Sequence, residues 1–258
     1  MKSSESQWLA ARRTAIAREA DGMVNRACAL LPSDWDKPTR CTSWTVRDLL
    51  RHVVEGISLY TEGLTRMAHG ATDLVPASSL VKVGSTPREV CSRLAEGRQQ
   101  LGTALTTLTP EVLNGLFPHR FFLLPGHLAL DIVLMEEGMH HNDLAWALGD
   151  QVSLPGPVAT AAFGYASARA LEWAVDGEPP SHDLRYRLIG KTVRLELMWR
   201  DGRWTVVRDD ARPDCELRGQ DSALALFLYG RLSWTSSRLS VTGDKSLAGR
   251  FKAFLPGP

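Results

Sequence analysis

Apolar side chains recur at helical spacing in four segments within roughly the first 150 residues. Apolar residues that return every three or four positions are typical of helices that bury one face. Turns rich in Pro, Ser, Asp and Gly separate the segments, and such residues favour chain reversals. The pattern predicts helices at residues 4–31, 46–68, 86–107 and about 126–149. Four helices joined in this way suit antiparallel packing in a bundle.

The pattern changes beyond residue 153. One more helix is predicted over residues 158–175, and the polar linker 176–183 follows it. Apolar and polar residues then alternate, which predicts strands, and Asp201-Gly202 is a favoured hairpin turn between two of them. The predicted elements of this part are strands within 184–190, 192–210, 215–219 and 238–243, and helices at 221–232 and 245–255.

The fold class that follows is α plus α+β. Helical and strand-rich patterns are segregated along the chain, which is typical of separate domains. We predict a helical bundle over residues 1–176 and a small α+β domain over residues 177–258. A chain of 258 residues is long enough to bury a core in each.

Composition excludes several classes of function. Hydrophobic residues make up 44% and charged residues 23% of the chain, which is ordinary for a globular protein. The net charge of +1 gives no electrostatic footprint for nucleic acid or an anionic membrane. The N-terminus lacks the apolar core of a signal peptide. The longest apolar run cannot span a membrane, because it is interrupted by Pro125, Gly126, His127 and Asp131. We therefore expect a cytoplasmic monomer with no nucleic-acid or membrane partner.

The four cysteines are scattered along the chain and form no Cys-x-x-Cys pair. This spacing favours reduced thiols in a cytosolic protein over a disulfide framework. Isolated cysteines are most often small core residues, and we expect Cys41 to pack beneath the start of the helix at 46–68. Any thiol chemistry is therefore expected from a cofactor. The cysteines are Cys28, Cys41, Cys91 and Cys215.

Glu136 and His140 lie four residues apart in the helix predicted at about 126–149. Four residues turn an α-helix by about 400°, so both side chains project from one face, about one turn apart. A carboxylate and an imidazole at this spacing suit a bound metal ion. A structural Glu paired with His or Arg would give the same pattern, and the spacing alone does not separate the two interpretations.

Glu137 and His141 repeat this spacing one residue later, and the helical wheel distinguishes the two pairs. At about 100° per residue, Glu136 and His140 fall among aliphatic residues, on the side expected to be buried. A carboxylate buried there without a partner would cost several kcal/mol or take up a proton, and a cation removes that cost. The opposite side, expected to be exposed, carries His127, Asp131, Gly138 and Asn142.

His52 is the candidate for a third ligand. Thr45 and Asp48 have the form of a capping box, a hydroxyl at the helix start and a carboxylate three residues on. The apolar residues that follow keep helical spacing, and His52 lies at the edge of the apolar face. A histidine in such a position is more often a core residue than a ligand, and sequence spacing cannot bring it to Glu136.

A family resemblance supplies this connection. The string WTVRDLLRH from Trp44 to His52, preceded by Cys41, occurs together with a later pattern of Glu136, His140 and Asp143 spaced E-x-x-x-H-x-x-D. The combination resembles the mycothiol-dependent maleylpyruvate isomerase family within the DinB-like metalloenzymes. The resemblance covers roughly the first 150 residues, and two motifs in the right order are fairly specific.

The resemblance implies a DinB-like four-helix bundle that holds a divalent metal, usually zinc. One His from the second helix and a Glu and a His from a later helix are the ligands in that family. These roles fall on His52, Glu136 and His140. Asn142 is a departure, because the family often has Trp there, and this bears on the pocket wall and substrate fit more than on the metal.

The second domain resembles the C-terminal domain of the same family, which is distantly like sterol carrier proteins. The segment from Leu228 to Arg231 matches a Leu-x-Gly-Arg element of the family. The resemblance implies that its arginine, Arg231 here, is a catalytic residue in the active site. Guanidinium offers a fixed fork of donors to a carboxylate; the alternative is a surface or interface salt bridge. Asp143 either orients a ligand or substrate group behind the metal or satisfies a donor inside the bundle.

Three protein ligands leave a coordination position open, as in catalytic zinc sites. The resemblance implies that this position takes mycothiol as a thiolate, which adds to an electrophilic or carboxylate-bearing small-molecule substrate. The outcome is cis-trans isomerisation of a maleylpyruvate-like acid, or S-transfer in detoxification or natural-product biosynthesis. Two alternatives stay open: a metal-dependent hydrolase whose open position carries water, and a non-enzymatic binding module with a structural metal. The sequence does not identify the residues that bind the thiol.

Overall fold

The computed structural model of the chain describes all residues except Met1, Thr42, 78–85, 151–152, Ala174 and 257–258. The chain forms two compact units, Met1–Val152 and Ser153–Pro258. The sequence-based boundary at residues 176 and 177 divides the chain differently, because it assigns the helix after residue 153 to the first part.

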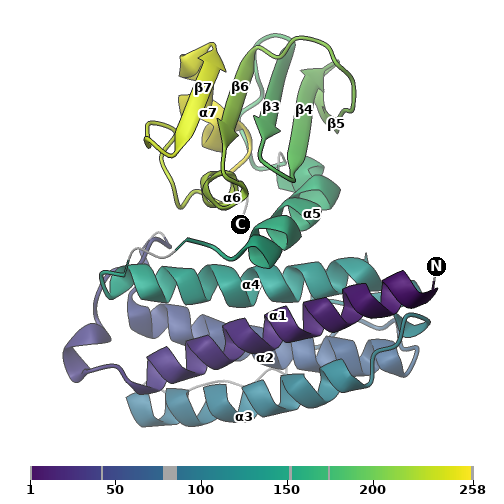
Figure 1. The fold of residues 1–258 in the computed structure, drawn as a ribbon, viewed down its shortest axis with the longest axis vertical. Coiled ribbons are helices and arrows are strands. Elements are labelled where there is room, and N and C mark those ends of the chain that lie inside the picture. Colours follow the sequence, from purple (N-terminus) through teal and green to yellow (C-terminus); the bar gives the residue numbers. More distant parts are fainter. Residues whose placement is uncertain (1, 42, 78–85, 151–152, 174, 257–258) are drawn as a thin grey trace. The chain divides into compact units, whose positions relative to one another are not determined.

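The first unit is a bundle of four long helices (Figure 1). α1 packs against α3 and α4, and α2 packs against the same two helices. Short 3-10 helices at Pro32–Asp34 and Val112–Asn114 lie in the connections. The predicted bundle is confirmed, and each helix ends within a few residues of its predicted bounds. The helices are α1 Lys2–Cys28, α2 Val46–Ala68, α3 Pro87–Thr106 and α4 Gly126–Ala147.

The start of α2 is fixed by the predicted capping box. The Thr45 hydroxyl accepts from the Asp48 backbone N–H at 3.3 Å, and the Asp48 carboxylate accepts from the Thr45 backbone N–H at 3.0 Å. These bonds satisfy two donors that the first turn leaves free. The Thr45 hydroxyl also donates to the Asp48 carboxylate at 2.7 Å, and this bond, with the one from the Thr45 backbone N–H, lowers the pKa of Asp48. The first turn of α2, which precedes His52, is therefore locally determined by the sequence.

α4 is enclosed on nearly all sides, and here the predicted exposed face is wrong. His127 is exposed as predicted, but Asp131, Gly138 and Asn142 are buried. Asp131 is 2.9 Å from the Arg12 guanidinium on α1, while burial raises its pKa to about 6. α4 packs against both α1 and α2, and partners on two sides bury polar positions that a one-sided wheel assigns to solvent.

A short hairpin that the sequence pattern did not predict precedes α4. Its strands are β1 Leu116–Pro118 and β2 Leu123–Pro125. The buried Phe117 ring packs against Gly63 of α2. A Cβ at Gly63 would lie 2.5 Å from this ring. Glycine therefore allows this close approach between the hairpin and α2.

The second unit contains helix α5 Gly156–Trp173 and a five-stranded sheet in the order β5-β4-β3-β6-β7. β3 and β6 are parallel, and the other neighbouring pairs are antiparallel. α5 packs against α6, β4 and β5. The predicted α+β character of this part is confirmed. The remaining elements are β3 Leu184–Ile189, β4 Arg194–Arg200, β5 Arg203–Val206, β6 Cys215–Gly219, α6 Asp221–Leu228, β7 Leu239–Gly243 and α7 Lys245–Phe254.

One face of this sheet packs on α6 and α7. The buried Tyr186 hydroxyl donates to the Leu247 carbonyl of α7 at 2.7 Å, and its ring meets Phe251 edge to face at 5.1 Å between centroids. Phe227 of α6 contacts the same Phe251. Alternate residues of the strands thus build one apolar core, as the period-two pattern predicted.

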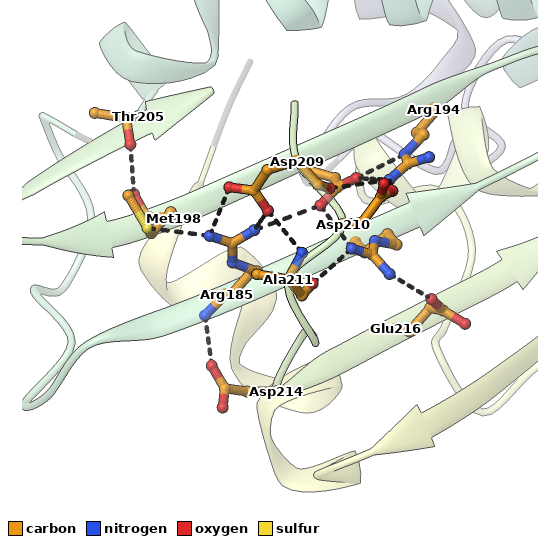
Figure 2. Close-up of polar contacts among 11 residues, drawn as sticks. Arg185, Arg194, Met198, Thr205, Asp209, Asp210, Ala211, Asp214 and Glu216 are labelled. Carbon is orange, nitrogen blue, oxygen red and sulfur yellow. Dashed lines mark hydrogen bonds and ion pairs between the residues drawn. The ribbon is translucent and has the colours of Figure 1, made fainter. Parts of the chain in front are cut away.

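The opposite face carries charged residues, and the connection from β5 to β6 crosses over it (Figure 2). Arg187 donates to the Ala211 carbonyl at 2.7 Å, Arg194 donates to the Asp209 carbonyl at 3.2 Å, and Arg185 bonds the Asp209 carboxylate. Buried Glu196 lies 3.0 Å from Arg187. Carboxylates thus neutralise the arginines, and the network holds the crossover in place.

No helix among the described residues is both long and apolar enough to cross a lipid bilayer.

Candidate metal centre

His52, Glu136 and His140 converge in the first unit, as the motif analysis expected. Glu136 Oε2 lies 3.2 Å from His140 Nε2 and 3.5 Å from His52 Nε2. All three potential ligand atoms lie within 4.8 Å of one another. The two imidazole rings meet edge to face with 4.9 Å between their centroids. The side chains come from α2 and α4, which pack together, so tertiary packing supplies the contact that sequence spacing could not.

The ionisation of Glu136 suits cation binding. Burial alone raises the pKa of Glu136, but hydrogen bonds with His140 and His52 outweigh burial and hold its pKa well below the usual range. Its carboxylate is therefore ionised at neutral pH. One carboxylate oxygen and two imidazole nitrogens form a donor set that zinc and other divalent ions accept.

The cluster is open on one side. The exposed fraction of the side chain falls from 41% for His52 to 21% for Glu136 and 8% for His140. A metal held by these three groups would therefore be reachable by a small molecule from the His52 side. Three protein ligands with one accessible side are typical of catalytic metal sites, and closed sets of four are typical of structural ones.

A second layer of side chains fixes His140 from behind. Its Nδ1 lies 3.3 Å from the buried Asp143 carboxylate, which also accepts from the Cys41 thiol at 3.3 Å. Arg40 lies 3.3 Å from the other Asp143 oxygen and donates to Asn142. A carboxylate behind a histidine sets the tautomer and orientation that a metal ligand needs. This geometry supports the orienting interpretation of Asp143.

Sequence reasoning missed the roles of Arg40 and Cys41. Cys41, His140 and Asp143 form a second group that could hold a metal, through the opposite nitrogen of the same imidazole. Arg40 also lies over the Trp146 ring at 5.8 Å. The only available signal was that both residues immediately precede the Trp44 motif, because their partners lie about 100 residues later in the chain.

The neighbouring pair Glu137 and His141 points elsewhere. His141 Nδ1 lies 3.0 Å from the buried Glu19 carboxylate of α1. Its ring fills the space above Gly22, where a Cβ would come within 2.4 Å. Glu137 is buried, and burial raises its pKa to about 8. Glu137 and His141 therefore lie outside the group formed by His52, Glu136 and His140. The burial argument from the helical wheel was wrong, because Glu137 is more deeply buried than Glu136.

Arg231 lies in the second unit, just after the end of α6. Its guanidinium donates to the Tyr229 carbonyl at 2.8 Å, and the left-handed Gly230 (φ 74°) makes the turn between them. Lys252 of α7 donates to the Leu228 carbonyl at 3.2 Å. Burial and the charge of Arg231 lower the pKa of Lys252 to about 8. Two cations therefore lie close together at the C-terminus of α6.

Metal binding is expected to depend on pH through His140. Burial lowers the pKa of His140, but hydrogen bonds to Asp143, Cys41 and Glu136 raise it well above 6.5. The metal-free protein therefore keeps His140 protonated at neutral pH, and a metal must displace that proton. We predict that the apparent zinc affinity rises between about pH 6 and pH 8, by up to about tenfold per pH unit for one released proton.

The stability of the metal-free protein is expected to move the opposite way. The pKa of His140 is higher in the folded protein than the value of 6.5 expected for the unfolded chain, so protonation stabilises the folded state. This stabilisation is complete below pH 6.5 and is lost as the pH rises through the pKa of the folded protein. Titration calorimetry with zinc in two buffers would count the protons that metal binding releases. Thermal unfolding of the metal-free protein at pH 6 and pH 8 would show the loss of stability. Zinc affinity that does not change with pH would contradict a protonated His140.

Family comparisons cover both units. The family model described as the mycothiol maleylpyruvate isomerase N-terminal domain matches residues 16–145, and the model for the C-terminal domain of the same family matches residues 154–250. The first match spans the whole candidate centre and the second includes Arg231. No curated protein sequence matches the chain.

Two solved structures share the fold. They are crystal structures of the mycothiol-dependent maleylpyruvate isomerase and of a histidine-to-alanine mutant of that enzyme. Each is 12% identical to this chain, with a TM-score of 0.64, and the alignment covers 91% of this chain and 92% of the other. At this identity the likeness concerns the fold, and it extends over both units.

Proposed function

The chain belongs to the mycothiol maleylpyruvate isomerase family of enzymes, and on that premise we propose that it is a zinc-dependent enzyme that activates mycothiol. The proposed reaction adds the thiol to an electrophilic small-molecule acid. Its outcome is isomerisation of a maleylpyruvate-like substrate or net transfer of sulfur. Mycothiol is the proposed thiol cosubstrate.

One observation carries this proposal. Two imidazole nitrogens and one carboxylate oxygen, from two different helices, lie within 4.8 Å of one another around an accessible side of the bundle. The donor set suits zinc, and three ligands leave a position for an exogenous group. Thiols are strong partners for zinc in the deprotonated form.

The metal, when bound, supplies a positive charge that stabilises the sulfur of the thiol as a thiolate at neutral pH. His52, Glu136 and His140 would hold that charge in place. Asp143 keeps the His140 ring oriented through Nδ1. Trp44 lies against the His52 ring at 4.8 Å between centroids and limits its motion on the accessible side.

Arg231 is the proposed binding group for the substrate carboxylate. Its guanidinium can form two parallel hydrogen bonds to a carboxylate, and the nearby charge of Lys252 increases the attraction for an anion. Capping of α6 through the Tyr229 carbonyl restrains the guanidinium. A residue fixed in this way loses less conformational entropy when it binds.

The two outcomes begin with the same bond. The thiolate sulfur adds to an electron-poor carbon of the substrate double bond, and a proton adds to the neighbouring carbon. The remaining single bond can rotate. Loss of that proton and expulsion of the thiolate then restore the double bond in the trans form, with mycothiol regenerated. Retention of sulfur in the product gives S-transfer.

Thiol dependence of turnover tests this function. With zinc-loaded protein and a cis-unsaturated diketo acid, we expect no turnover above background until mycothiol is added. Isomerisation would need only catalytic amounts of mycothiol, whereas S-transfer would consume it in proportion to product. Turnover that needs no thiol and releases a hydrolysis product would instead support the metal-dependent hydrolase. Absence of turnover with and without thiol, across electrophilic acids, would support a binding module.

A further inference from the structure

A pocket of about 440 Å³ opens directly beside the proposed ligand His52. Its volume lies within the roughly 300–1,000 Å³ typical of small-molecule sites. The loop before α2 and the first turns of α2 form its walls. The lining residues are Ser43, Trp44, Asp48, Arg51, His52 and Glu55.

The helical residues of this pocket form one stripe along α2. Asp48, Arg51, His52 and Glu55 are spaced by three, one and three residues, so they share a face. Arg51 and Glu55 have the spacing of a helical ion pair, yet within the described part of the chain neither side chain forms an ion pair or a hydrogen bond, and the charge of Arg51 acts only at longer range on Asp48. Their donors and acceptors are therefore available to a ligand.

The loop wall is fixed by the backbone. Trp44 donates from its backbone N–H to the Cys41 carbonyl at 3.0 Å, and its carbonyl accepts from the Thr39 N–H at 2.9 Å. Ser43 takes the left-handed conformation (φ 66°) and its side chain is exposed in the pocket. The partly exposed Trp44 ring adds an apolar surface next to His52.

The charges of the pocket select among ligands. Two carboxylates, Asp48 and Glu55, flank a single guanidinium, Arg51. A dianionic keto acid would be repelled here, because like charges at close range are unfavourable. A neutral polyhydroxylated group can donate to both carboxylates and accept from the guanidinium and from Ser43. An indole ring beside such polar groups suits the apolar face of a sugar ring.

The geometry points to this pocket as the binding site for the polyhydroxylated head of the thiol cosubstrate, with Glu55 and Arg51 as its recognition residues. The inference rests on the proposed function. Mycothiol carries its thiol on an acetylated cysteine, joined through an amide to an amino sugar and a cyclitol. With the sulfur at the centre formed by His52, Glu136 and His140, the sugar and cyclitol would extend along α2.

Direct binding measurements test the site. Titration calorimetry of zinc-loaded protein would compare mycothiol with N-acetylcysteine amide, a neutral thiol that lacks the sugar and cyclitol. We expect Glu55→Gln and Arg51→Gln each to weaken mycothiol binding by about 10- to 100-fold, the loss of one hydrogen bond to a charged group. Binding of N-acetylcysteine amide and the zinc content are expected to stay unchanged.

Glu62→Gln is the matched control, because Glu62 lies two turns further along α2, outside the pocket, and pairs with Arg66. It should bind both thiols like the parent protein. Unchanged mycothiol affinity in Glu55→Gln and Arg51→Gln, or an equal loss for both thiols, would overturn the head-group site while leaving the proposed function intact. A parent protein that binds neither thiol would contradict the proposed function and this inference together.

Discussion

Replacement of His140 by Ala is expected to remove most of the bound metal. The parent protein should carry close to one divalent ion per chain, with zinc the best fit to the donor set. His140 supplies one of three ligand atoms that converge within 4.8 Å. Removing a ligand should weaken metal binding by more than about 100-fold, because loss of an outer partner alone typically costs 10- to 100-fold. His52→Ala should have the same effect, and elemental analysis of purified protein measures both.

Two histidines provide matched controls. His141→Ala alters the next residue of α4, whose ring bonds Glu19 and not the cluster. His69→Ala alters the residue that ends α2, where the ring contacts the Thr65 carbonyl. Both controls should retain the metal. Nickel or iron in place of zinc would leave the ligand set standing, because histidine and carboxylate ligands accept them too. Full metal content in both His52→Ala and His140→Ala would refute it.

Replacement of Arg231 by Lys is expected to lower kcat/KM by about 10- to 100-fold. Lysine keeps the positive charge but lacks the planar fork that binds a carboxylate through two bonds. The loss corresponds to one charge-assisted hydrogen bond of roughly 1.5–3 kcal/mol. Steady-state kinetics with the acid substrate would measure it, while metal content and mycothiol affinity should stay at the parent values.

Arg200→Lys is the control for this variant. Arg200 lies in the same unit, and its guanidinium pairs with Asp183 at an exposed position. The same change of side chain there should leave kcat/KM unaltered. If Arg231→Lys has the kcat/KM of the parent protein, Arg231 does not bind the substrate carboxylate, and its role is to cap α6.

The regular elements could be predicted because each carries its own periodic signal. The start of α2 depends on Thr45 and Asp48, which bond each other within one turn. The alternation in 184–189 matches a strand with one face on the core, whereas in 194–200 Glu196 on the opposite face is buried as well. Local sequence was sufficient where local interactions fix the structure.

Prediction failed where partners are distant in sequence. α4 has partners on two sides, so Asp131 and Asn142 are buried by contacts with Arg12 and Arg40 that no helical wheel contains. The hairpin at 116–125 has strands of three residues, too short to show a period. Its position depends on packing against α2.

The candidate centre was only partly available from the residues alone. Glu136 and His140 share one face by spacing, and the geometry confirms that they meet. His52 could be joined to them only through the family resemblance, because its place depends on how α2 packs against α4. Asp143 was noted, but its bond to the Cys41 thiol needed the fold. Local patterns define helix faces, and tertiary packing defines which faces meet.

The most direct test of the central claim is the absorption spectrum of the cobalt-substituted protein during titration with mycothiol. If the thiol sulfur binds a metal held by His52, Glu136 and His140, a sulfur-to-cobalt charge-transfer band should grow and saturate. His52→Ala, which lacks a ligand, should show no such band. An unchanged parent spectrum at saturating mycothiol would contradict the claim that this centre activates the thiol.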